Sequence, residues 1–198
     1  MKVYRFPRSR SLKVLWTLEE LGASYDSVKV DLLSTNGTVK PPHPFGKVPY
    51  LIDGDLSISE TLAICIFLCE KYGDDELYPT DPTEKSRVNS WISFAITDLE
   101  SSVWGLLKQL LFTTEETRRE DVINYFREEV NNVVSQLKID DRTRWIASDS
   151  FSLADIFMSQ TLQWAKFCGI ELNEQINIYL KRTTDRASYL RAEQLNDA

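Results

Sequence analysis

The amino-acid sequence predicts an α/β domain followed by an all-helical domain. Within residues 1–80, short runs rich in β-branched and aromatic residues alternate with stretches of helical spacing. An acidic segment with two prolines at 74–83 is typical of a linker, and beyond it only helical periodicity remains. The 198 residues are enough for two small domains. We expect these domains to span residues 1–76 and 84–198.

Four short strands are expected in the first domain. Their residues are apolar or alternate between apolar and polar positions, as the residues of strands do. Pro7 ends the first run, and Asp53-Gly54 is a strong hairpin signal between the last two. The expected strands are Val3–Phe6, Tyr25–Val30, Val48–Ile52 and Leu56–Ile58.

Two helices are expected to alternate with these strands. From Ser11 onward apolar residues recur at helical spacing, and Gly22 supplies a C-terminal stop. A second helix is expected from Ser59 to Tyr72, directly after the hairpin. The segment 34–45 carries three prolines and is expected to be a loop.

The second domain is expected to contain helices only. Its apolar residues recur at helical spacing, and no strand pattern is visible. The expected helices are Glu84–Leu111, Glu115–Leu137, Ser152–Cys168, Asn173–Thr184 and Ala187–Leu195. Ser152 and Asp155 have the spacing of a capping box at the start of the third helix.

Composition and charge exclude several classes of function. The 23 basic and 30 acidic residues give a net charge of −7, which argues against binding of nucleic acid or of an anionic membrane surface. The longest apolar run, Leu62–Cys69, is far shorter than the roughly 20 residues of a membrane span. The first residues contain no apolar core of a signal peptide. We therefore expect a soluble, cytoplasmic protein.

The few cysteines and the single histidine argue against metal binding and against a histidine-based catalytic site. Cys65 and Cys69 lie one helical turn apart in an apolar stretch and are interpreted as buried thiols. No CxxC motif or metal-ligand spacing occurs. Because His43 is the only histidine, neither a histidine-based catalytic triad nor a multi-histidine metal site is expected.

The first of three chemically suggestive features is Pro49. A proline within a strand implies an edge position, a bulge or a cis peptide bond. A cis Val48-Pro49 bond would turn the backbone groups of Val48 outward, where an extended peptide could pair with them. An ordinary edge proline is the alternative.

The second feature is Ser59-Glu60-Thr61, at the expected start of a helix. Either hydroxyl can cap the helix, and the helix N-terminus favours an anion. Glu60 opposes an anion and is better suited to accept from an ammonium group. The three residues together suit the amine and carboxylate of an α-amino acid, whereas a plain helix cap is the alternative.

The third feature is Ser9-Arg10-Ser11, where the first strand gives way to a helix. A hydroxyl here can donate to an anion at the positive end of the helix dipole, and a thiolate would be stabilised. The alternative is that either serine is only a helix cap. Residues 1–18 carry five basic and no acidic residues, which predicts a local basic pocket around Arg10.

In this order the three features resemble the soluble glutathione S-transferases, in particular theta-like, fungal-type or related bacterial classes with an activating serine. The resemblance spans nearly the whole chain. The segments that carry it are Ser9–Gly22, His43–Pro49, Ser59–Ile64, Phe151–Ile156 and Tyr179–Ala192. It implies a thioredoxin-like N-terminal domain, an all-helical C-terminal domain and a homodimer.

The resemblance also implies roles for individual residues. Ser9, or as second choice Ser11, would stabilise the glutathione thiolate, and Val48 before Pro49 would pair with the cysteinyl part. Glutathione would be a co-substrate, with no further cofactor and no metal. The other expected glutathione contacts are Glu60 and Thr61 for the γ-glutamyl head, Lys47 or Lys40 for the glycyl carboxylate, and Arg10.

The implied reaction is conjugation of glutathione to a small hydrophobic electrophile. Trp104, Leu107 and Leu111 are candidates for the acceptor site, although helical spacing of such residues also fits a core. A glutathione-dependent peroxidase, dehalogenase or isomerase is the alternative activity. A non-catalytic interaction module with the same fold is the alternative class.

Three positions depart from the family pattern. His43 stands where asparagine is common, Thr61 replaces a serine, and Ala187 occupies a common proline position. None of these departures removes the expected thiolate donor. A bacterial beta-class cysteine would fall where Arg10 stands, so cysteine chemistry is not expected.

Overall fold

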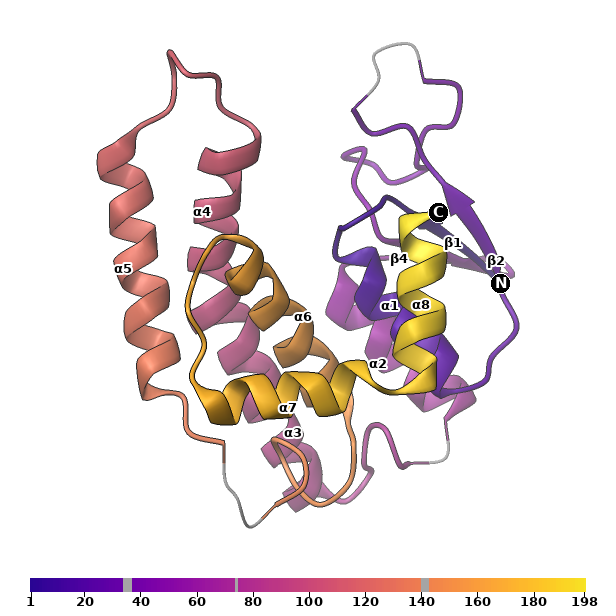
Figure 1. Ribbon diagram of the computed structural model, residues 1–198. Coiled ribbons are helices and arrows are strands. Elements are labelled where there is room, and N and C mark those ends of the chain that lie inside the picture. Colours follow the sequence, from indigo (N-terminus) through magenta and orange to yellow (C-terminus); the bar gives the residue numbers. More distant parts are fainter. Residues whose placement is uncertain (34–36, 74, 140–142) are drawn as a thin grey trace. The chain divides into compact units, whose positions relative to one another are not determined.

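A computed structural model of the chain describes residues 1–33, 37–73, 75–139 and 143–198 (Figure 1). Residues 34–36 of the expected loop and Asp74 of the expected linker lie outside this description. By their internal contacts the residues form two units. One unit comprises Met1–Thr80 together with Asp185–Ala198, and the other comprises Asp81–Thr184.

The first unit is built on a four-stranded sheet in the order β2-β1-β3-β4. β1 and β2 are parallel, whereas β3 pairs antiparallel with both β1 and β4. The parallel pair is joined through α1, since parallel strands need a crossover connection. The elements of this unit are β1 (Lys2–Arg5), α1 (Ser11–Glu20), β2 (Asp26–Lys29), β3 (Tyr50–Asp53), β4 (Leu56–Ser59), α2 (Thr61–Tyr72) and α8 (Ala187–Asp197).

The strand and helix boundaries differ from expectation mainly around the predicted site. Pro49 precedes β3 instead of lying inside it. The expected helix from Ser59 begins only at Thr61, because Ser59 pairs with Tyr50 as the last residue of β4. Gly54 adopts a φ of +61° in the turn between β3 and β4, as the hairpin signal predicts.

The helices α1 and α2 pack against each other, and α8 packs along α1 (Figure 1). Trp16 of α1 is fully buried, and its ring meets Tyr189 of α8 edge-on at 4.8 Å. The expected second domain, residues 84–198, thus includes a C-terminal helix that folds with the first unit. Local periodicity predicts the helix but carries no information about which sheet or bundle it joins.

The second unit consists of helices, and it begins with one long helical stretch. α3 (Pro82–Phe94), the π-helical segment η1 (Ala95–Glu100) and α4 (Ser101–Leu111) follow one another without a break. The expected helix 84–111 is therefore continuous but contains a π segment in its middle, which the periodicity does not predict. The remaining helices are α5 (Glu120–Gln136), α6 (Leu153–Phe167) and α7 (Glu174–Thr184).

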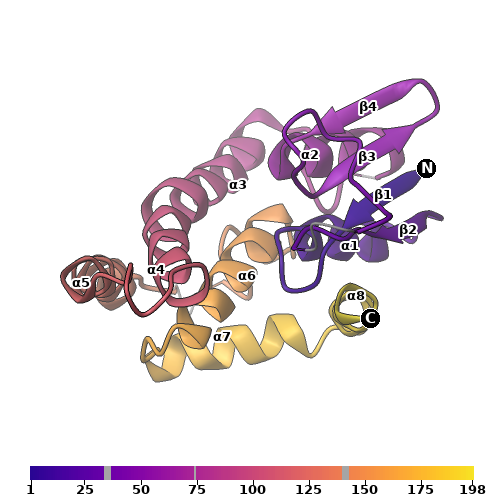
Figure 2. The same cartoon turned by 90° about the horizontal axis from the view of Figure 1, so that it is seen from above.

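Close approach of α4 and α5 depends on Gly105. A Cβ atom at this position would lie 2.5 Å from the Phe126 ring. α6 contacts α3, η1 and α4, and α7 packs on α6 (Figure 2). The expected helix from Glu115 begins only at Glu120, since the preceding residues form a turn in which the Thr114 carbonyl accepts from Arg118 N–H at 2.9 Å.

Candidate glutathione site

The sheet register brings the three features of the sequence to one end of the first unit. Tyr4 of β1 lies opposite Tyr50 of β3, and Tyr50 lies opposite Ser59 of β4. β1 runs from this row toward Ser9, β3 begins here directly after Pro49, and β4 ends here before Glu60. The segment around Ser9 therefore meets two segments that follow it much later in the sequence, at the same end of the sheet.

Ser9 and Ser11 form a connected pair at the N-terminus of α1. The Ser9 hydroxyl donates to the Phe6 carbonyl at 2.7 Å, accepts from the Ser11 N–H at 3.1 Å, and lies 2.9 Å from Ser11 Oγ. Ser9 precedes the N-cap residue Arg10, and its oxygen accepts from the N–H of the first residue of α1. Ser9 is partly exposed and Ser11 is fully buried, so only Ser9 offers its hydroxyl to a ligand.

A hydroxyl carries one proton, so Ser9 can donate to a thiolate only if it stops donating to the Phe6 carbonyl. Its oxygen can keep accepting from the Ser11 N–H while its proton turns from the Phe6 carbonyl to a sulfur atom. Accepting from the Ser11 N–H and donating to a thiolate are therefore compatible roles of the Ser9 hydroxyl.

The five basic residues among residues 1–18 do not form a single exposed basic pocket. Arg5 is buried and donates to Ser27 Oγ at 2.7 Å and to the Asn196 carbonyl at 3.1 Å, which ties α8 to the sheet. Burial lowers the pKa of this guanidinium. Lys13 is only 1% exposed. Arg10 stays partly exposed beside the two serines, so the basic residues divide between core and surface.

The Val48-Pro49 peptide bond is cis, which decides between the two sequence interpretations of Pro49. Val48 is partly exposed and Pro49 is buried. Lys47 is exposed, with its Nζ 5.9 Å from the centre of the Phe45 ring. Lys40 is exposed as well. Both lysines are accessible to an anion in solution.

Glu60 has an unusual backbone conformation at the start of α2. Its φ of 70° and ψ of 120° lie outside the wells that residues with a side chain ordinarily occupy. Such a residue costs about 1–3 kcal/mol and persists where the surroundings determine it, often at functional sites. The Glu60 side chain makes no capping hydrogen bond, and Glu60 is exposed. Thr61 is mostly buried beside it.

The three candidates for the acceptor site have different environments in the second unit. Leu107 is only 4% exposed and belongs to the core, whereas Leu111 is 54% exposed. Trp104 is half-buried and stacks on Trp164 at 6.0 Å, and its ring also meets Phe112 at 6.0 Å. Sequence reasoning missed Trp164 and Phe112, because they lie on another helix and beyond a helix end.

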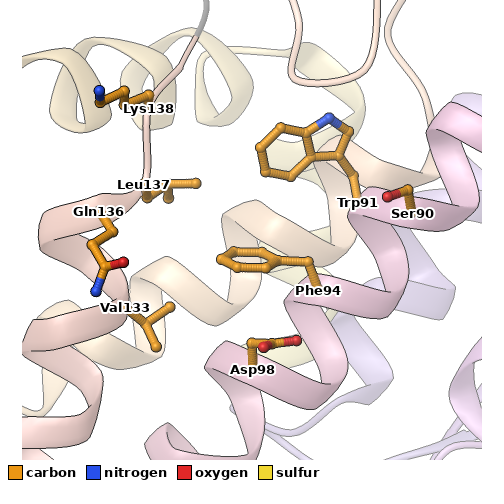
Figure 3. Close-up of a pocket in the computed structure, with 8 residues that line it drawn as sticks. All are labelled: Ser90, Trp91, Phe94, Asp98, Val133, Gln136, Leu137 and Lys138. Carbon is orange, nitrogen blue, oxygen red and sulfur yellow. The ribbon is translucent and has the colours of Figure 1, made fainter.

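A cavity of about 480 Å³ also lies in the second unit, between the stretch of α3 and η1 and the end of α5 (Figure 3). The rings of Trp91 and Phe94, 5.7 Å apart and edge-on, point toward Val133 and Leu137. Asp98 lines one end of the cavity. None of the predicted site residues lines it.

The cysteines are not candidates for a reactive thiol. All three are free and buried, as the sequence predicts for Cys65 and Cys69. Burial raises the pKa of Cys65 to about 12 and that of Cys168 to about 11. Among the described residues, no group of three or more potential ligands is arranged to hold a metal ion. Within the same ranges, no helix is long and apolar enough to cross a membrane.

Comparisons with known proteins define the class. Residues 3–77 match the family profile described as "Glutathione S-transferase, N-terminal domain". Glutathione S-transferase F10 of Arabidopsis thaliana is 31% identical over 157 residues, which are 74% of this chain and 72% of the relative. Glutathione S-transferase GstA of Escherichia coli O157:H7 is 27% identical over 195 residues, 94% of each protein.

A solved structure agrees with these relatives. The beta class glutathione S-transferase of Sphingomonas chungbukensis is 27% identical, with a TM-score of 0.85 over 99% of this chain and 98% of that chain. The fold is therefore a thioredoxin-like domain joined to a helical domain, as predicted. The chain belongs to the glutathione S-transferase family, whose members use glutathione as a co-substrate.

Proposed function

We propose that the chain binds glutathione at the sheet edge where Ser9, Val48 and Glu60 meet, and conjugates it to small hydrophobic electrophiles. The observation that carries this proposal is the register Tyr4, Tyr50, Ser59. In this register the strand ends that lead to Ser9, Val48 and Glu60 lie side by side, which supports the proposal.

Each group has a function that its chemistry supports. Glu60 accepts from the ammonium of the γ-glutamyl head, and the N-terminus of α2 with Thr61 binds its carboxylate. The backbone of Val48 pairs with the cysteinyl peptide unit. Lys47 or Lys40 binds the glycyl carboxylate, with Arg10 as a further positive group near the thiol.

The reaction requires a thiolate at neutral pH. A free thiol titrates at about 8.5, and donors at a helix N-terminus lower this value. The Ser9 hydroxyl donates to the sulfur, which then attacks the electrophile. With an aryl halide, the new S–C bond uses the thiolate electron pair, and the halide leaves with the electrons of the C–halogen bond.

The acceptor is proposed to lie against the aromatic cluster of the second unit. Trp104 and Leu111 present apolar surface there, extended by Trp164 and Phe112. Leu107 has too little exposed surface to contribute directly.

A homodimer is proposed as the assembly, as the resemblance implies. Size-exclusion chromatography with light scattering tests it, and a monomer mass would contradict it. A reducing, cytoplasmic location is proposed because three thiols remain free.

The test compares Ser9→Ala with Ser11→Ala in an aryl halide conjugation assay. Ser9→Ala is expected to keep its affinity for immobilised glutathione while kcat/KM near neutral pH falls about 10²-fold, the usual effect of losing one donor to a developing or bound anion. Its pH–rate profile is expected to shift to higher pH.

An unchanged pH–rate profile in Ser9→Ala, together with a shifted pH–rate profile in Ser11→Ala, would assign stabilisation of the thiolate to Ser11 instead of Ser9. Glutathione retention without turnover on any electrophile would favour a binding module. If the unsubstituted protein neither binds immobilised glutathione nor turns over any electrophile, the proposed function is overturned.

A further inference from the structure

Arg8, one residue before Ser9, has a backbone conformation that disfavours an arginine. Its φ is +56°, in the left-handed region, where the Cβ atom is crowded by the following carbonyl oxygen. Among the described residues other than glycine, a positive φ occurs besides only at Glu60 and Asp75. Two of the three positions thus lie at or beside the proposed glutathione contacts, and strained residues tend to cluster at functional sites.

A tight turn surrounds Arg8. Pro7 precedes it, and a proline followed by a residue of positive φ is the pattern of a type II turn, in which glycine or asparagine ordinarily follows the proline. The turn starts at Phe6, directly after β1, and ends at Ser9, directly before the N-cap residue of α1. Arg8 therefore stands where the chain is redirected from the strand to the helix.

The Ser9 hydroxyl closes this turn in the free protein by donating to the Phe6 carbonyl at 2.7 Å. This hydrogen bond spans Arg8, so it forms only when the backbone of Arg8 is folded back. The bond is lost when the proton turns to a thiolate, because a hydroxyl has only one proton. In the complex, the place of Ser9 relative to β1 then depends on the backbone conformation of Arg8.

The side chain of Arg8 does not hold this conformation. Arg8 is exposed, and within the described part of the chain its guanidinium has no hydrogen bond, ion pair or aromatic contact. The ends of the turn are held instead by the buried residues Val3 of β1 and Leu12 of α1, and Pro7 restricts the backbone between them. The side chain at position 8 can therefore be exchanged without disturbing the core.

We propose that Arg8 is a positioning residue for the thiolate donor, and that its left-handed backbone keeps the Ser9 hydroxyl at the N-terminus of α1 while this hydroxyl donates to the glutathione sulfur. This inference rests on the proposed function and adds a residue to it. The feature that acts is the backbone of Arg8 and not its charge. Residues that adopt a positive φ readily can therefore replace Arg8, whereas β-branched residues cannot.

The test compares Arg8→Asn with Arg8→Val, which remove the same charge from the same exposed position. Asparagine is enriched in the left-handed region, whereas a β-branched residue is an outlier there. In the aryl halide assay near neutral pH, kcat/KM is expected to stay within about twofold in Arg8→Asn and to fall about fivefold in Arg8→Val, as the added strain implies. The pH–rate profile is expected to move to higher pH in Arg8→Val only, while both variants are retained on immobilised glutathione.

Two controls separate positioning from a general loss of structure. Lys2→Asn and Lys2→Val make the same pair of replacements at an exposed residue of β1, where valine is favoured, so valine is expected to cause no loss relative to asparagine. In a Ser9→Ala background, Arg8→Val is expected to cause no further shift of the pH–rate profile, because no hydroxyl remains to be positioned.

A second readout does not depend on glutathione. The midpoint of thermal unfolding is expected to be at least as high in Arg8→Asn as in the unsubstituted protein, and lower in Arg8→Val. Equal pH–rate profiles in Arg8→Asn and Arg8→Val, or an equal shift from Arg8→Val with and without the Ser9 hydroxyl, would overturn the inference. If the midpoints follow this order but neither the variants nor the unsubstituted protein bind glutathione, the proposed function is overturned and the strained turn is not.

Discussion

Two carboxylates, one in each unit, are surrounded by several donors, yet their pKa values shift in opposite directions. Glu20 at the end of α1 has a lowered pKa, and Asp155 in the first turn of α6 has a raised pKa. Both connect segments that are distant in the sequence. The two sites differ in depth of burial and in the charge of the donors.

Glu20 is held by a cation. Burial alone would raise its pKa, but hydrogen bonds from Arg186, Ser188 and Trp16 outweigh burial and lower it. The guanidinium of Arg186 donates through Nε at 2.7 Å and Nη2 at 2.6 Å, and Trp16 Nε1 donates at 2.9 Å. This cluster fastens the start of α8 to α1.

Asp155 is held by neutral donors. Burial raises its pKa, although four hydrogen bonds act in the opposite direction. Oδ1 accepts from the Ile146 N–H and the Tyr179 hydroxyl, each at 2.9 Å, and Oδ2 accepts from the Ser152 N–H at 2.9 Å. Asp155 thus joins the start of α6 to the segment before it and to α7. At Asp155 burial outweighs the neutral donors, whereas at the less deeply buried Glu20 the donors, which include a cation, outweigh burial.

The largest effect is expected from Asp155→Ala. Several buried donors would lose their acceptor at once, at about 1–3 kcal/mol each, so the free energy of unfolding should fall by about 3–5 kcal/mol. Urea denaturation measures the change. Asp149→Ala is the matched control, because Asp149 accepts from the Arg144 N–H at an exposed site. Equal losses in both variants would contradict the role of burial.

Glu20→Ala is expected to have the next largest effect, about 2–3 kcal/mol, since the partly exposed Arg186 can regain water while Trp16 and Ser188 lose their acceptor. Limited proteolysis should release the C-terminal segment 185–198 earlier than in the unsubstituted protein. Earlier cleavage elsewhere in the chain, with this segment protected, would show that Glu20 does not fasten α8.

The pH dependence of stability should differ in sign between the two sites. The lowered pKa of Glu20 contributes stability above the ordinary value of 4.5, and this contribution is lost as the pH falls through the folded-state pKa. The raised pKa of Asp155 does the reverse, because protonation favours the folded state. Urea midpoints at several pH values should show the deficit of Glu20→Gln shrinking toward acid and that of Asp155→Asn growing. Parallel trends would contradict the assigned shifts.

The smallest effect is expected from Glu19→Gln, one residue before Glu20. Glu19 also pairs with α8, through Arg191 at 2.6 Å, but the Arg191 side chain is 55% exposed. Such pairs contribute about 0.2–1 kcal/mol. The amide oxygen can still accept from Tyr25, which donates to Glu19 at 2.8 Å. Urea denaturation measures the change. A loss of unfolding free energy as large as that of Glu20→Ala would show that solvent exposure does not determine how much these ion pairs contribute.

Several local features of the structure follow from short sequence signals. Ser152 and Asp155 form the predicted capping box, and Gly22, with a φ of +60°, follows α1 as predicted. The strands and helices are in the expected order, because hydrophobic periodicity and turn residues act over a few residues. The identities of Ser9, Val48 and Glu60 as candidate ligands likewise came from short motifs.

Tertiary structure decided the rest, because it depends on contacts between distant residues. The pairing of Glu20 with Arg186 spans 166 residues, and no local pattern assigns α8 to the first unit. Burial distinguishes the exposed Ser9 from the buried Ser11, which the sequence offered as a second choice, and the exposed Leu111 from the buried Leu107. The sequence by itself indicated which groups are candidates for binding glutathione. Only the register of β1, β3 and β4 brought their segments to one end of the sheet, since strand pairing is set by packing of the whole sheet.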